Sequence, residues 1–145
     1  MVDPINLRVN GSSTWLKDAS TQMVTCSNSG NTAATKVMYS SYTGSWAQFQ
    51  IPAGSKYIPL IIQFQSNHTG SATGNGDIQL SDGAAGVAGT TKWECQMQVN
   101  GSADSSAMSS FDVYLDGWAA TEHVNVTVDS TAYWGISITG ILTTV

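Results

Sequence analysis

Two pairs of acidic residues are the first candidates for a catalytic or calcium-binding site. Asp112 and Asp116 lie four residues apart, and so on one face of a strand, whereas a glycosidase places two carboxylates about 5–10 Å apart across a cleft. No other strand offers a partner acid, so we interpret this pair as solubilising charges that guard an edge strand. Asp77 and Asp82 follow a Gly-Asn-Gly turn. Their spacing matches no calcium-binding loop, so we interpret both as solvated turn residues.

The histidines and possible nucleophiles form no recognisable site. His68 falls in a predicted loop and His123 on the polar face of a predicted strand, without the HxH, CxxC or HExxH spacing of a zinc site. No G-x-S-x-G sequence places a serine nucleophile. For the only cysteines, Cys26 and Cys95, we favour a buried free thiol and leave a disulfide open. We therefore predict no catalytic residue, no metal, no cofactor and no enzymatic activity.

The five tryptophans divide into two groups. Trp93 and Trp134 alternate in phase with apolar residues, so we expect both in the core. Trp15, Trp46 and Trp118 show no such phase. An aromatic ring can stack on the C–H face of a pyranose, or it can anchor a contact between subunits. We favour the core or an interface over sugar binding for these three residues.

Composition narrows the class of partner. The chain has 145 residues, enough for one domain with a core, and only 10% of them are charged, with a net charge of −5. The few cations form no cluster that could release counterions from nucleic acid. No apolar run reaches the length of a membrane span, and the amino terminus does not resemble a signal peptide. The polar, uncharged surface suits contacts with proteins or sugars.

Alternation of apolar and polar residues recurs along the chain. It is clearest in "WECQMQV", "HVNVTV" and "WGISITGIL". Gly-, Ser- and Asn-rich segments separate the alternating stretches, and we predict loops there, among them residues 27–35 and 100–110. No window shows a capped helical period. We predict an all-β fold of eight to ten strands, an antiparallel β-sandwich of the jelly-roll type. Residues 16–145 would form this one domain, and residues 1–15 an amino-terminal arm or first strand.

The segment "KYIPLIIQFQS", residues 56–66, is the most apolar of these stretches. Period two predicts that its even positions from 58 to 64 line the core. Tyr57 and Ile61 would then lie on the opposite face, covered by another element or another subunit. Pro59 cannot donate to a ladder, so we expect an edge or a bulge at this end of the strand.

Two segments resemble the virion β-sandwich proteins of tailed bacteriophages. They are "IPAGSKYIPLIIQFQS" (51–66), with its Pro-Ala-Gly turn before an apolar strand, and "FDVYLDGWAATEHVNVTVDSTAYWGISITGIL" (111–142), which ends in a strand of the form "v.i.G". The usual "aG.s" is replaced here by "ATEH". The resemblance implies a jelly-roll decoration, cement or head-fibre protein, assembled in the host cytoplasm into the virion. It further implies a homotrimer whose partner is the major capsid protein.

Two functional hypotheses follow. The first is a capsid decoration protein that stabilises the shell without catalysis, with an arm through "MVDPINLRV" docked on it. The second is a lectin-like, carbohydrate-binding module, used in attachment to a host, which would bind a glycan. We expect no nucleic acid and no membrane as partner. The candidate contact residues are Tyr57, Ile61, Trp15, Trp46 and Trp118.

Overall fold

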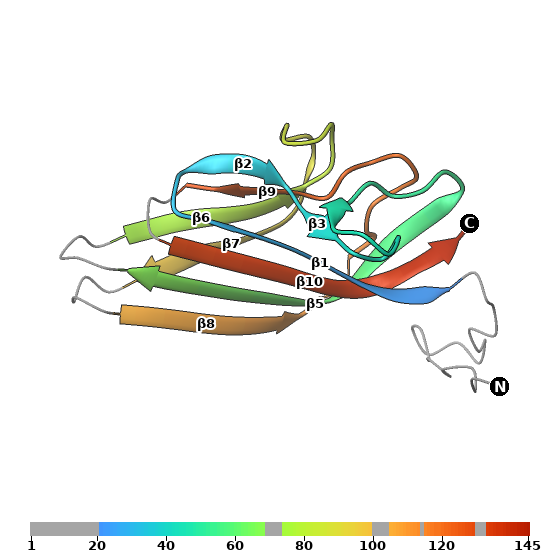
Figure 1. Cartoon of the computed structure of the whole chain (residues 1–145). Helices are drawn as coiled ribbons and strands as arrows, with labels where there is room; N and C mark the ends of the chain where they lie inside the picture. The colour runs from blue at the N-terminus through green and yellow to red at the C-terminus, as the bar shows by residue number, and fades with distance from the viewer. Residues whose placement is uncertain (1–20, 69–73, 100–104, 114, 130–132) are drawn as a thin grey trace.

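The computed structural model describes residues 21–68, 74–99, 105–113, 115–129 and 133–145 (Figure 1). The predicted amino-terminal arm, residues 1–15 with Trp15, lies outside the described residues. Two antiparallel sheets pack face to face, and no described residue is helical. The predicted all-β sandwich is therefore confirmed.

The larger sheet has six strands and the smaller has four. In spatial order, the larger sheet contains β4 (Ala47–Gln48), β3 (Tyr39–Ser40), β1 (Gln22–Gly30), β10 (Tyr133–Thr144), β5 (Ser55–His68) and β8 (Ser105–Asp112). The smaller sheet contains β2 (Ala34–Val37), β9 (Asn125–Val128), β6 (Gly74–Ser81) and β7 (Thr91–Val99).

The strands pair in a nested series. β6 pairs with β7, β5 with β8, β2 with β9, and β1 with β10. The chain thus forms a long hairpin of two antiparallel halves. Successive strand pairs along this hairpin belong alternately to the larger and the smaller sheet. Contacts of β10 with β5 and of β9 with β6 close this hairpin into the sandwich.

Alternating β-branched and aromatic residues build the core between the sheets. In β9, Val126 and Val128 are buried, and in β10 the buried set includes Trp134, Ile136 and Ile138, as period two predicted. Trp93 of β7 packs against this core while staying partly exposed. The core positions of Trp93 and Trp134 are confirmed.

A bulge in β5 changes which of its residues face the core. Ile61 lies opposite Thr139 and Pro59 opposite Gly140, so Leu60 has no partner in β10. The expected irregularity at Pro59 is confirmed. Because one extra residue reverses the alternation, the buried positions are 57 and 59 before the bulge and 62 and 64 after it. The prediction that positions 58 and 60 face the core was wrong.

Tyr57 and Trp118 are core residues rather than contact residues, because both are fully buried. The Tyr57 hydroxyl lies 3.1 Å from the Val24 carbonyl and 3.0 Å from that of Ile138. The Trp118 indole N–H donates to the Ser81 carbonyl at 2.9 Å. Their polar atoms thus find partners inside the sandwich, which is how large aromatic residues with a polar handle become core.

Two serine-rich stretches predicted as loops are partly strands. β1 continues to Gly30 and β8 begins at Ser105, whereas loops were expected over 27–35 and 100–110. Serine suits these positions because the described side chains of β8, residues 109–112, are exposed, as is Ser29 of β1. Sheet pairing outweighs the turn preference of serine here.

The buried thiol of Cys26 lowers the stability of the fold at alkaline pH. Both cysteines are free thiols, and burial raises the pKa of Cys26 from 9.0 to about 12, with a smaller opposing effect from Tyr57. A thiol whose folded-state pKa is raised contributes its full stability below pH 9, and that contribution is lost as the pH rises from 9 towards 12. We expect the free energy of unfolding to fall by about 1.4 kcal/mol per pH unit above pH 9 from this group.

Urea unfolding at pH 8, 9.5 and 10.5 measures this loss. The control is Cys26→Ala, which lowers stability at pH 8 but has a shallower dependence on pH. Parallel curves for the two proteins would show that Cys26 does not cause the alkaline loss.

Candidate functional site

The carboxylates that could have formed a catalytic pair have other surroundings. Asp112 ends β8 and lies opposite Ile61 on the outer face of the larger sheet. Asp116 lies beyond β8 and accepts a hydrogen bond from Lys56 Nζ at 2.9 Å. This hydrogen bond lowers the pKa of the Asp116 carboxyl, so the group is an exposed, ionised surface residue.

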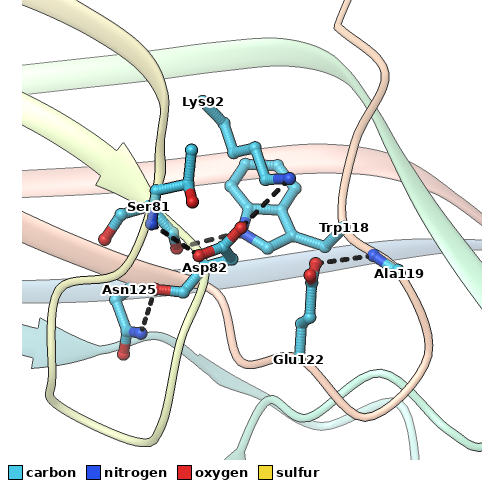
Figure 2. Close-up of polar contacts among 8 residues, drawn as sticks. Ser81, Asp82, Lys92, Trp118, Ala119, Glu122 and Asn125 are labelled. Atoms are coloured by element: carbon cyan, nitrogen blue, oxygen red, sulfur yellow. Dashed lines mark hydrogen bonds and ion pairs between the residues drawn. The ribbon is translucent and has the colours of Figure 1, made fainter.

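Asp82 organises the loop over residues 82–90, which joins β6 to β7 (Figure 2). Its carboxylate accepts from the Thr90 backbone N–H at 2.6 Å and lies 3.1 Å from Lys92 Nζ. The Asp82 carbonyl also accepts from the Gly89 N–H at 2.8 Å. The acid is therefore a turn residue, as predicted, although it bonds within the loop instead of standing free in solvent.

Asn125 fastens this same loop to the smaller sheet. Its fully buried side chain donates to the carbonyls of Asp82, Ala84 and Val87 at 3.0–3.2 Å. It also accepts from the Gly86 N–H at 2.9 Å. The two N–H donors of this amide are shared among three carbonyls and its oxygen serves the Gly86 N–H, so one side chain ties four backbone groups of the glycine-rich loop together.

Within the described ranges, no three His, Cys, Asp or Glu side chains gather where they could hold a metal ion. Among the same residues, no helix is long and apolar enough to cross a membrane.

The outer face of the larger sheet carries an unbroken row of uncharged polar side chains. Register places one residue of each strand in this row, which points away from the smaller sheet. Ser27 and Ser137 lie at its centre, between the core-facing positions of β1 and β10. The complete row is Gln48, Tyr39, Ser27, Ser137, Gln63 and Ser110.

A groove of about 550 Å³ lies over this row, and we call it the aromatic groove. Tyr39 and Trp46 line it from the β3–β4 side, with ring centroids 6.1 Å apart and planes inclined by 17°. Tyr133, at the start of β10, adds a third aromatic side chain. Trp46 is 62% exposed, so most of its surface is open although its ring is held by Tyr39.

The floor of the aromatic groove comes from β1, β10 and β5. Ser137 lies 3.5 Å from the Gln63 side-chain oxygen. Two residues along the strands, Gly135 pairs with Gln65, and a Cβ at Gly135 would stand 2.9 Å from Gln65 Nε2. Glycine therefore leaves the space in which the Gln65 amide lies. None of the twelve lining residues is Asp, Glu, Lys, Arg or His.

The remaining contact candidates lie on this outer face. Trp46 lines the aromatic groove, and Ile61, 37% exposed, lies on β5 beyond its floor. The groove's other members could not be chosen from the sequence because residues 39, 63 and 133 meet only through strand pairing. Only the lack of alternation around Trp46 marked one of them in advance.

No protein-family model matches this chain, and a search of curated proteins finds no match.

Proposed function

We propose that the chain is a structural virion protein that decorates a bacteriophage capsid as a homotrimer, without catalysis. It would be assembled onto the shell in the host cytoplasm, with the major capsid protein as its partner. The motif resemblance at residues 51–66 and 111–142 supports this proposal, and so does the connectivity. Leaving out β3 and β4, the nested pairs β1–β10, β2–β9, β5–β8 and β6–β7 are compatible with a jelly roll, the type of sandwich that we propose.

The observation that carries the proposal is the open edge at β8. Among the described strands, β8 pairs with β5 alone, and β7, the edge of the smaller sheet, pairs with β6 alone. Trp93 of β7 and Phe111 of β8 lie with ring centroids 5.5 Å apart, so the two edges lie on one side of the sandwich. An eight-residue edge offers a row of backbone donors and acceptors to another chain.

The side chains at this edge favour a protein as its partner. Asp112 is the one charged residue of β8. Phe111 is 36% exposed and Ile61, on the neighbouring strand, is 37% exposed. Soluble proteins usually protect a long edge with lysines or a bulge. A copy of the same chain that packs on β8 would cover exposed apolar area at this edge, and Asp112 is the only charge of β8 that would need to be desolvated.

Co-sedimentation with capsid shells tests the proposal. The probe is shells assembled from the major capsid protein encoded by the same genome, mixed with the purified full chain. We expect saturable binding at a fixed ratio and a higher melting temperature of the shells. If the chain stays in the supernatant at tens of micromolar, its dissociation constant for the shells is roughly above 10⁻⁵ M. That result would contradict the proposal.

A charge at Ile61 is expected to separate the trimer into single chains. Ile61→Glu places a carboxylate at an exposed apolar position that a neighbouring copy would cover, where the charge would lose water without gaining a partner. The molar mass measured by light scattering should then fall from that of three chains to that of one chain. The stability of the separated chain should fall by no more than about 1 kcal/mol, because the new carboxylate lies opposite Asp112 on the neighbouring strand of the same chain.

The matched control is Gln48→Glu, which adds the same charge at the opposite edge of the same sheet. It should leave the mass unchanged. A trimer that survives Ile61→Glu, or a wild-type chain that is already monomeric, would contradict the placement of the contact at β8.

A further inference from the structure

The aromatic groove has the composition of a binding site for an uncharged ligand. Its twelve lining residues include no acid, no base and no histidine. A phosphate, a carboxylate or an ammonium group in the groove would lose water without gaining a charged partner. The groove therefore excludes nucleotides, anionic sugars and charged peptides as favoured ligands.

The tryptophan supplies a flat, exposed apolar platform in a groove whose floor carries serine and glutamine side chains. Trp46 stacks on Tyr39 and keeps 62% of its surface exposed. A large exposed ring is costly in water unless a ligand covers it, and its orientation is already fixed by the stack. The ligand must thus combine an apolar face with the ability to hydrogen-bond around its rim.

The floor of the groove supplies the complementary hydrogen-bonding groups. Gln63 and Gln65 each carry a donor and an acceptor in one amide, and Ser27 and Ser137 add hydroxyls that serve as either. Gly135 keeps the space for the Gln65 amide open. Sugar hydroxyls also both donate and accept, so they match this floor better than an apolar ligand would.

We propose that the aromatic groove binds a neutral oligosaccharide, with one pyranose ring stacked on Trp46 and its hydroxyls bonded to Gln63 and Gln65. The volume of about 550 Å³ lies in the range of small-molecule sites and accommodates a few sugar units. The Trp46 platform lies beside β3, and β1, β10 and β5 separate it from the β8 edge, whereas the floor of the groove extends to β5, the partner of β8. Glycan binding thus goes beyond capsid decoration, and each proposal can fail alone.

A glycan array of neutral and anionic oligosaccharides, probed with the purified full chain, gives the first result. We expect binding to neutral members only. Titration calorimetry with the best of them then measures the affinity per site. Trp46→Ala should weaken it by about tenfold or more, roughly the loss of one well-stacked anchor, and Gln65→Ala should weaken it to a smaller extent.

The matched control is Met23→Ala, which truncates another exposed side chain of the same sheet outside the groove. It should keep the wild-type affinity. Three outcomes would overturn the proposal: no glycan bound on the array, a preference for anionic glycans, or an unchanged affinity in Trp46→Ala. Since Trp46→Ala leaves the β8 edge intact, its binding to capsid shells should stay normal, which separates this test from that of the decoration function.

Discussion

Replacing Gly117 by alanine is expected to destabilise the fold strongly. Gly117 is buried with a positive φ of 80°, and an added Cβ would overlap the Tyr57 carbonyl oxygen. That carbonyl accepts from the Trp118 N–H at 2.9 Å, and the Tyr57 N–H donates to the Trp118 carbonyl at 2.9 Å. Relief of the overlap would break this bridge and displace two core aromatics. We expect a loss of more than about 3 kcal/mol.

Urea unfolding followed by tryptophan fluorescence measures this loss. Gly54→Ala is the matched control, because Gly54 has a similar φ of 71° but nothing within 4 Å of its added Cβ. The stability of that variant should fall only by the backbone strain, about 1 kcal/mol. Equal losses in the two variants would mean that the approach of Gly117 to Tyr57 is not what fixes this bridge.

Asn125→Asp is expected to have the second-largest effect, although it changes few atoms. The new carboxylate would face the carbonyls of Asp82, Ala84 and Val87, which the amide now satisfies as a donor. Because the site is fully buried, an uncompensated charge there should cost about 3 to 5 kcal/mol. The cost should shrink at acidic pH, since the protonated acid is neutral and can donate one hydrogen bond.

Urea unfolding at pH 7 and pH 4, together with hydrogen exchange of the 82–90 amides, measures both effects. The control is Asn28→Asp, which removes a single donor from the half-buried bond to the Val37 carbonyl. It should cost about 1 kcal/mol. Wild-type stability and an unchanged exchange rate in Asn125→Asp would show that the loop is not held by this amide.

The period of the sequence was enough to predict the sandwich, since burial on one face of each strand is a local property. Val126, Val128 and Trp134 could be placed in the core for this reason. The sequence signals the bulge at Leu60 locally through Pro59, but it does not signal how the bulge changes the burial of the residues around it. Which of the two alternating sets is buried before and after it depends on pairing with β10, seventy and more residues away.

The polar core groups and the candidate site were harder to predict. Asn125 alternates with valines, so its pattern indicated a solvated position, and only the loop that folds over it reveals its role. Trp118 lies outside the named strands and is buried through a bridge with Tyr57. The aromatic groove is assembled from separate strands by the sheet order, which a single sequence does not encode locally.

The most direct measurement of the proposed function is a single-particle reconstruction of capsid shells decorated with this chain. We expect trimeric density on the shell, with the β8 strands of neighbouring copies in contact and the aromatic groove, next to β3 and β4, facing solvent. Bound chains that sit as isolated copies with β8 exposed, or shells that carry no added density at all, would contradict it.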